Sequence, residues 1–187
     1  MIKSVILSLL VALPFCMEAH SESEGFNMHI CAFHIAKDDP SVVIETQHYC
    51  SALKDDLFQC ILFETTDKKP KLLGVEYVIS DALYQTLPVE EKKLWHPHDF
   101  EVREGLLALI GGDKKSQEDT MKVLVKSWGK TWHTWPDPKT ELPLGEPRLM
   151  WSAEKEGQIP QEMIKQRDER FHIDTSKLKE ERKAYLK

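Results

Sequence analysis

The sequence lacks several features that would assign it to a common class of enzyme or nucleic-acid-binding protein. It has no C-x-x-C pair, no G-x-S-x-G and no glycine-rich phosphate loop, so redox dithiols, zinc ribbons, serine-nucleophile elbows and P-loops are unsupported. Basic residues are also scarce relative to acidic ones, 25 Lys and Arg against 31 Asp and Glu, for a net charge of −6. An acidic chain without a clustered basic face disfavours nucleic acid as a partner.

Long apolar runs are missing after the first 20 residues. The longest is Leu106–Ile110, which has the length of a strand, whereas a helix that spans a bilayer needs roughly 20 apolar residues. The first segment has one lysine, an apolar run from Val5 to Met17 and then small and polar residues, which is the layout of a secretory signal peptide. We therefore predict a cleaved signal peptide over 1–20, export to a periplasmic or secreted location, and no transmembrane segment in the mature chain.

Strands dominate the first two thirds of the remaining sequence. Segments 27–36, 42–50, 58–64, 71–80 and 100–112 have the β-branched, partly alternating pattern of strands. Helices are predicted from Ser80 or Asp81, from Pro88, and from about residue 115 to Gly129, and Thr175–Lys187 is predicted to be either a docked helix or a frayed tail. Strands and helices do not alternate strictly. We therefore predict an α+β fold, in which 21–187 form a single domain with a mainly antiparallel sheet, a few helices and a charged segment from about 158.

Three cysteines follow the predicted signal peptide: Cys31, Cys50 and Cys60. An odd number in an oxidising compartment implies a leftover thiol, an intermolecular bridge or a metal thiolate. The polar stretch LKDD is a candidate hairpin bend, and a bend centred near Asp55 would place Cys50 opposite Cys60. A cross-strand disulfide between these two cysteines is then feasible.

Three short motifs place a histidine two residues before a second candidate ligand: His29-x-Cys31, His48-x-Cys50 and His96-x-His98. Residues two apart on a strand point to the same face, so each pair would present two ligands side by side. Imidazole and thiolate together suit Zn, Cu or Fe. The predicted site for a divalent transition metal such as Zn consists of His48, Cys50, His96, His98 and Glu101, and His34 and His133 are further candidates.

Each of these residues also has a structural interpretation. A histidine between apolar residues is commonly a hydrogen-bonded structural group, and a half-buried cysteine commonly behaves as a small apolar residue. Pro97 interrupts regular strand pairing between His96 and His98, so these two side chains could diverge from a loop. The pattern alone therefore leaves a metal site and an internal hydrogen-bond network open.

The order of several long segments resembles the oil body-associated protein family. The segments are HICAFH, QHYC, LLGVEYVIS, LPVEEKKLWHPHDFEV, GKTWHTW and LPLGEPRLMWS, and the resemblance runs from Met28 to about Gly157. The chain is identified as a bacterial-type member with an export signal. The candidate residues that lie in these segments are His29, Cys31, His34, His48, Cys50, Cys60, His96, His98, Glu101 and His133.

The resemblance implies association with a lipid surface, because plant members of the family are found on seed oil bodies. The resemblance assigns neither a catalytic activity nor a cofactor to the chain, so whether the chain is an enzyme stays open. The sequence has no long apolar hairpin for insertion, and contact with lipid would therefore be peripheral. A peripheral lipid-surface protein is the favoured hypothesis, and a metal-binding protein or metalloenzyme with a His/Cys/Glu cluster is the alternative.

Overall fold

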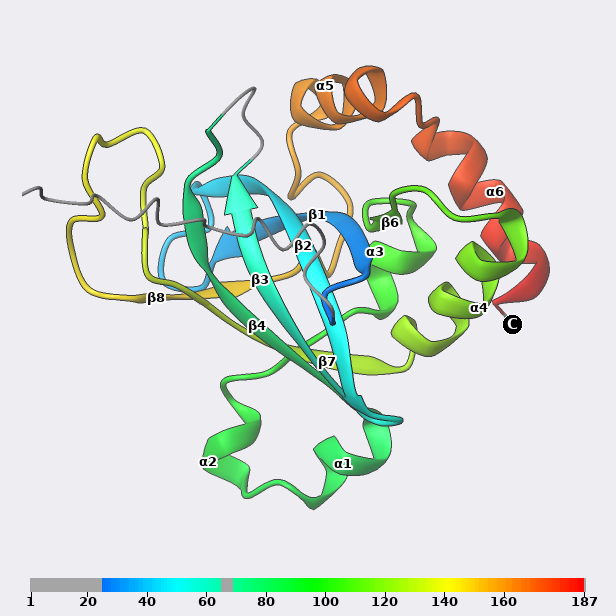
Figure 1. Cartoon of the computed structure of the whole chain (residues 1–187), viewed down its shortest axis with the longest axis horizontal. Helices are drawn as coiled ribbons and strands as arrows, with labels where there is room; N and C mark the ends of the chain where they lie inside the picture. Colours follow the sequence, from blue (N-terminus) through cyan, green and yellow to red (C-terminus); the bar gives the residue numbers. More distant parts are fainter. Residues whose placement is uncertain (1–24, 65–68, 187) are drawn as a thin grey trace, which may run out of the picture.

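Six strands of the protein close into an antiparallel barrel (Figure 1). The computed structural model describes residues 25–64 and 69–186, and the predicted signal peptide lies outside them. The barrel strands are β1 (Met28–Ala36), β2 (Val43–Lys54), β3 (Leu57–Glu64), β4 (Leu72–Ser80), β7 (Ser127–His133) and β8 (Arg148–Trp151). Two short strands, β5 (His96–Pro97) and β6 (Ala108–Leu109), extend this sheet by pairing with β7 and β1.

The barrel closes because β1 pairs with two strands that are far apart in the sequence. Along one edge it pairs with β2, from Met28↔Cys50 to Ile35↔Val43. At its other edge Ile35 pairs with Trp151 and Ala36 with Met150 of β8. Closure gives β1 partners at both of its edges and leaves alternate residues of every strand facing a shared interior.

The α+β fold predicted from the sequence is wrong, because the closed barrel makes the protein mainly β. The sequence indicates individual strands, but it does not indicate that β1 and β8, more than 100 residues apart, form a pair. The helices of the described ranges are short: α1 (Asp81–Thr86), α2 (Val89–Lys92), α3 (Asp99–Arg103), α4 (Lys114–Leu124), α5 (Gln161–Phe171) and α6 (Thr175–Tyr185). None of them is both long and apolar enough to cross a membrane.

Local structure differs most from expectation around α3. The segment 100–112 was expected to be a strand, but it begins in this helix and continues into β6. The backbone N–H of Val102 donates to the His98 carbonyl (3.0 Å), and Val102 is fully buried. In contrast, the predicted α1 is confirmed, and the Ser80 hydroxyl caps it by accepting from the backbone N–H of Leu83 (3.2 Å).

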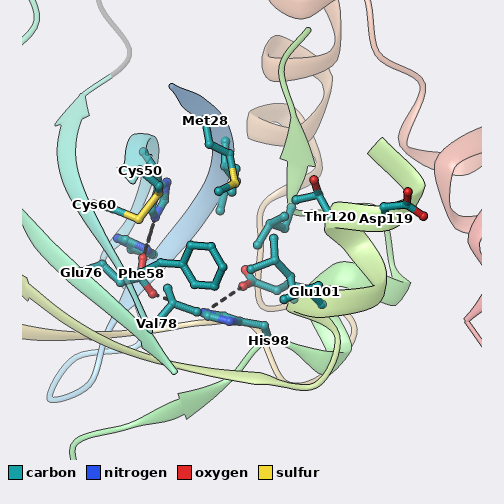
Figure 2. Close-up of a pocket in the computed structure, with 17 residues that line it drawn as sticks. Met28, Cys50, Phe58, Cys60, Glu76, Val78, His98, Glu101, Asp119 and Thr120 are labelled. Carbon is teal, nitrogen blue, oxygen red and sulfur yellow. Dashed lines mark hydrogen bonds and ion pairs between the residues drawn. A yellow bond between two sulfur atoms is a disulfide. The ribbon is translucent and has the colours of Figure 1, made fainter. Parts of the chain in front are cut away.

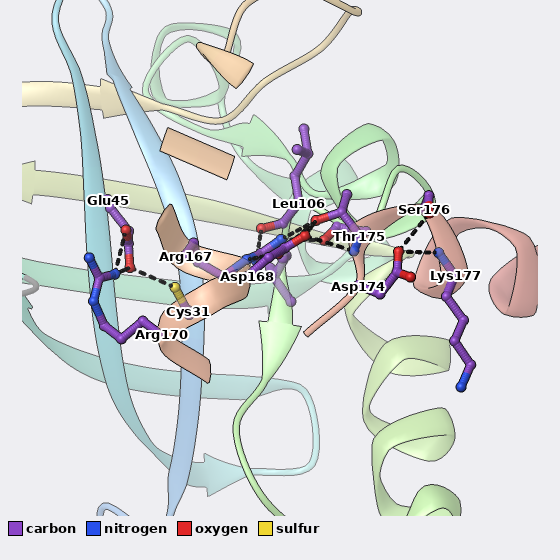
Figure 3. Close-up of polar contacts among 12 residues, drawn as sticks. Cys31, Glu45, Leu106, Arg167, Asp168, Arg170, Asp174, Thr175, Ser176 and Lys177 are labelled. Atoms are coloured by element: carbon purple, nitrogen blue, oxygen red, sulfur yellow. Dashed lines mark hydrogen bonds and ion pairs between the residues drawn. The ribbon is translucent and has the colours of Figure 1, made fainter. Parts of the chain in front are cut away.

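The charged C-terminal segment forms two docked helices, α5 and α6, which lie with α3 and α4 on one side of the barrel (Figure 1). The fully buried Arg167 side chain donates to the carbonyls of Leu106 and Gly105, each at 3.0 Å. Its neighbour Asp168 accepts from the backbone N–H of Thr175 (2.9 Å), which joins α5 to the start of α6 (Figure 3). These contacts fix both helices against the loop between α3 and β6.

Candidate metal centre

Inward-facing polar side chains converge at one place in the barrel interior. Because side chains alternate along a strand, His34 shares the interior face of β1 with Ile30 and Ala32, and His133 shares that of β7 with Gly129. The polar residues that meet here are His34 from β1, His48 from β2, Glu76 from β4, His133 from β7, His96 from β5 and His98 before α3. All six are buried.

Glu76 lies at the centre of this cluster. Four imidazole Nε2 atoms surround its carboxylate: those of His48 and His34 lie 2.9 and 3.7 Å from Oε2, and those of His98 and His96 lie 3.3 and 3.4 Å from Oε1. These residues form two sets that share Glu76: one contains His34 and His48, and the other contains His96 and His98. The three ligand atoms of each set lie within 4.8 Å of one another. This is close enough for each set to bind a common ion.

The hydrogen bonds of His48 determine which of its nitrogens faces Glu76 without a proton. Nδ1 lies 3.2 Å from the Thr46 carbonyl oxygen. A carbonyl only accepts, so Nδ1 carries the proton and the neutral ring has a lone pair on Nε2. That lone pair faces Glu76 Oε2 at 2.9 Å. Two acceptors at this distance repel each other unless a cation lies between them.

His98 repeats this arrangement from the opposite side. The Ser127 hydroxyl donates to the Leu124 carbonyl (2.8 Å), so it accepts from His98 Nδ1, also at 2.8 Å. The neutral His98 ring therefore directs an unprotonated Nε2 at Glu76 Oε1, 3.3 Å away. In metal sites a histidine commonly donates its other ring nitrogen to such a fixed acceptor, which sets both the tautomer and the ring orientation.

Three buried polar atoms of this region have no hydrogen-bond partner within the described ranges: His96 Nδ1, His133 Nδ1 and Thr131 Oγ1. His133 Nε2 is paired with His34 Nδ1 at 3.0 Å. Buried polar groups of folded proteins are normally satisfied, and exceptions indicate strain or an ion or water that completes the site. The cluster therefore has the unsatisfied character of a binding site.

Burial and the imidazole–carboxylate contacts set the ionisation of the cluster. Burial lowers the pKa of His34 to about 4, and it also lowers the pKa values of His96 and His133. Burial alone would raise the pKa of Glu76, but its contacts with the surrounding imidazoles, that of His34 first, outweigh burial and hold this pKa well below its usual range. The lowered pKa values favour a carboxylate at Glu76 and neutral imidazoles at His34, His96 and His133, which is the state in which both groups bind metal ions.

Glu101 has the opposite electrostatic character. Its Oε1 lies 4.0 Å from His98 Nε2, and burial followed by the Glu76 charge raises its pKa well above the usual range. Burial therefore favours the protonated form of this carboxyl group. Glu101 is therefore placed to donate a hydrogen bond or a proton beside the cluster.

Gly129 makes room for the cluster. It lies on β7 opposite His96 of β5. A Cβ at this position would lie 2.6 Å from His98 Nε2 and 2.7 Å from His96 Nε2, and closer still to Glu76 Oε1. Any side chain here would occupy the space in which the ligand atoms meet.

A pocket of about 280 Å³ connects the cluster to the region of α4 (Figure 2). The buried residues His34, His48, Glu76, His98 and Glu101 line one part of it. The half-buried or exposed residues Met28, Phe58, Asp119, Thr120 and Val123 line another part. The pocket thus has a buried polar floor and a mouth between β1, β3 and α4.

Four of the five predicted ligands lie at this site. His48, His96, His98 and Glu101 line it or contact Glu76, and His34 and His133 join them. Cys50 points into the pocket but forms a disulfide with Cys60, as the hairpin prediction anticipated, so it offers no thiolate.

The other two candidates lie apart from the cluster. His29 is paired with Gln47 at 2.8 Å. Cys31 is a buried free thiol 3.5 Å from Glu45, which in turn binds Arg170 of α5 (Figure 3). Because residues of odd and even number face opposite sides of β1, both side chains point away from the interior that His34 faces.

Sequence reasoning missed Glu76, the central residue. In LLGVEYVIS the apolar Val75 and Tyr77 flank it, and simple alternation would bury them and expose the glutamate. The structure does the reverse: Val75 is 37% and Tyr77 44% exposed, whereas Glu76 is 2% exposed. The available signal was a lone carboxylate inside an otherwise apolar strand segment.

Comparison with known proteins identifies relatives that match most of the chain. Residues 21–186 match the family model described as "Protein of unknown function (DUF1264)". Oil body-associated protein 1B of Arabidopsis thaliana is 37% identical over 161 residues, which cover 86% of this chain and 66% of that protein. Oil body-associated protein 2C of the same plant is 39% identical over 169 residues, which cover 89% and 71%.

A maize relative is similar to the same extent. Oil body-associated protein 1A of Zea mays is 37% identical over 161 residues, which cover 86% of this chain and 67% of that protein. The chain thus spans about two thirds of the length of these relatives. No solved structure matches the chain.

Proposed function

This chain belongs to the oil body-associated protein family (DUF1264), and within that family we propose that it acts as a metal-binding protein. The proposed centre is one divalent transition-metal ion at Glu76. Its ligands are the Glu76 carboxylate and the imidazole nitrogens of one of the two sets, His34 with His48 or His96 with His98.

The tautomers of His48 and His98 are the observation that carries this proposal. Each ring is held by a fixed acceptor at Nδ1, and each directs an unprotonated Nε2 at an oxygen of Glu76. A proton on one ring would satisfy one of these acceptor pairs. A metal ion bound by one set satisfies the ring and the carboxylate of that set together, and it also accounts for the approach of the second imidazole of the set, His34 or His96.

The donor set indicates the type of ion. Imidazole and carboxylate suit Zn, Fe, Cu and Ni, whereas Ca and Mg prefer sites made of oxygen. Cys50 is not part of the set, because its sulfur is bonded to Cys60. We therefore propose a centre with nitrogen and oxygen ligands only.

Elemental analysis of untagged protein tests the proposal. The protein is stripped with a chelator, loaded separately with Zn, Fe(II), Co(II) or Mn(II), passed over a desalting column and analysed for metal per chain. Wild-type protein should retain one equivalent of at least one of these ions. Glu76→Gln should retain less than a tenth of it, because the substitution removes the only ligand shared by both sets.

A matched control separates the loss of the site from the loss of the fold. Glu45→Gln makes the same chemical change on the outward side of β2, where the carboxylate binds Arg170. This variant should bind metal like wild type. Thermal unfolding of all three proteins reports folding independently. Absence of bound metal in folded wild type would refute the proposal, and two equivalents would assign one ion to each set.

Peripheral contact with lipid is a second candidate function. The relatives are named as oil body-associated, and Leu142 and Leu144, on the loop between β7 and β8, are 61% and 66% exposed. Exposed leucines on a loop can enter the interface of a membrane or droplet. Flotation with phosphatidylcholine vesicles, with and without phosphatidylglycerol, tests this role. Wild type should co-float and a Leu142→Glu, Leu144→Glu double variant should not; wild type that stays in the unbound fraction would exclude the role.

A further inference from the structure

We propose that the barrel pocket binds a monocarboxylate with a medium-length aliphatic chain, with its head at the metal ion and its chain directed toward α4. This inference rests on the proposed metal centre. It adds the chemical class of the ligand, which neither the metal site nor the family membership specifies.

The walls of the pocket match an aliphatic chain. They are formed by Met28, Ile30, Phe58, Val78, Leu107 and Leu124, and Figure 2 shows Phe58 and Val78 beside Glu76. These residues come from β1, β3, β4, α4 and the segment before β6, so the apolar surface encloses the space from several sides. Pockets that bind small molecules commonly combine such walls with a few placed polar groups.

The volume of the pocket limits the size of the ligand. At about 280 Å³ it is nearly twice as large as an apolar cavity of about 150 Å³ that holds benzene. A ligand of on the order of ten non-hydrogen atoms therefore fits inside. The mouth lies at Val123, which is 51% exposed, so longer chains would extend into solvent without gaining further contacts.

The charges at the floor favour an anionic head. A divalent ion bound by Glu76 and neutral imidazoles retains one positive charge. An entering carboxylate would neutralise the ion and occupy a free coordination position, whereas an alcohol would do only the latter.

Calorimetric titration of zinc-loaded protein with octanoate, butanoate and octanol tests the inference. Octanoate should bind on the order of 100-fold more tightly than butanoate, because four additional methylene groups are buried. It should also bind at least 10-fold more tightly than octanol, and chelation of the metal should abolish that preference for the carboxylate. Equal octanoate affinity in loaded and metal-free protein would overturn the inference, because the head would not contact the ion.

Variants of β4 separate the pocket from the metal site. Val78 lines the pocket, whereas Val75 lies on the opposite face of the same strand and is exposed. Val78→Phe should lose at least 10-fold in octanoate affinity, and Val75→Phe should bind like wild type, with one zinc per chain in both. If Val78→Phe fails to fold, Met28→Trp at the partly exposed mouth is the replacement test.

The two proposals fail in different ways. Protein that holds one zinc but does not bind octanoate overturns the ligand class and leaves the metal centre intact. Protein that retains none of the four tested ions but binds octanoate refutes the metal centre, and with it the placement of the carboxylate head.

Discussion

Substitution of Gly129 by alanine tests whether the ligand atoms of the barrel interior are held in fixed positions. In an ordinary strand, alanine in place of glycine stabilises the folded state by roughly 0.5–1 kcal/mol, because glycine loses more conformational freedom on folding. Gly129 is buried on β7, opposite His96, and its backbone has no positive φ that would require glycine. If the cluster were only a structural network with room to adjust, Gly129→Ala would be neutral or stabilising.

The distances predict the reverse. The added Cβ would lie 2.6 Å from His98 Nε2 and 2.7 Å from His96 Nε2, where ordinary contacts begin at 3.4 Å. The two nitrogens must therefore retreat by 0.8 and 0.7 Å, obtained by subtraction from these distances. Metal–ligand distances tolerate only about 0.2 Å. We expect metal affinity to fall about 100-fold or more, equivalent to about 3 kcal/mol, and the metal-free protein to lose about 1–3 kcal/mol through overpacking.

Competition titration against a chromophoric chelator measures the affinity, and urea unfolding of the stripped protein measures the stability. The control is Trp132→Phe, which changes the outward face of the same strand and leaves the barrel interior unchanged. It should retain the wild-type metal affinity. A Gly129→Ala protein that binds metal like wild type and is more stable would refute the proposed position of the ion.

Four further predictions follow from other contacts. In metal-free protein, burial lowers the pKa of His34 from 6.5 to about 4, so this residue contributes about 3 kcal/mol to the free energy of unfolding above pH 6.5, and this contribution is lost as the pH falls toward 4. His34→Gln should therefore flatten the decline of the urea-unfolding free energy between these pH values. An unchanged slope would contradict the assignment. Replacement of Cys50 and Cys60 by serine should lower the free energy of unfolding by about 2–3 kcal/mol without loss of metal. Loss of metal in this variant would indicate that a cysteine sulfur is one of the ligands. Burial raises the pKa of the Cys31 thiol to about 12, so this thiol should not react with iodoacetamide at pH 8 until the protein is unfolded. Mass spectrometry of the peptide that contains Cys31 measures the labelling, and labelling of the folded protein would contradict the burial of this residue. Arg167→Met leaves two buried carbonyl groups unpaired, so it should lower the free energy of urea unfolding by about 3 kcal/mol without changing the metal content. Hydrogen exchange should show a larger loss of protection in α5 and α6 than in the barrel. A smaller loss in these helices would contradict the docking role of Arg167.

The sequence predicts local elements of this fold better than their assembly. The hairpin of β2 and β3 follows from LKDD, and its register places Cys50 opposite Cys60 as expected. Closure of the barrel depends on a pairing between Ile35 and Trp151, and no local pattern indicates a contact over such a distance. An open sheet and a closed barrel have the same alternation along each strand, so the sequence does not distinguish them.

The candidate site was predictable in its residue types but not in its centre. His96 and His98 were expected on one strand with Glu101 nearby, yet residues 98 and 101 of a strand would face opposite sides. The helical turn at α3 brings them to one face, because residues three apart on a helix are neighbours. Glu76 escaped detection because Val75 and Tyr77, on the opposite face of β4, are apolar and were expected to be the buried residues. The inward direction of Glu76 follows from its pairing with Cys60 and Thr131 in the neighbouring strands.

X-ray absorption spectroscopy of the metal-loaded protein tests the central claim most directly. The account predicts a first shell of nitrogen and oxygen only, at about 2.0–2.2 Å for zinc, with the outer-shell scattering of at least two imidazole rings. Glu76→Gln should remove this spectrum, and Glu45→Gln should leave it unchanged. A sulfur shell at about 2.3 Å, or a metal coordinated by water alone, would contradict the account.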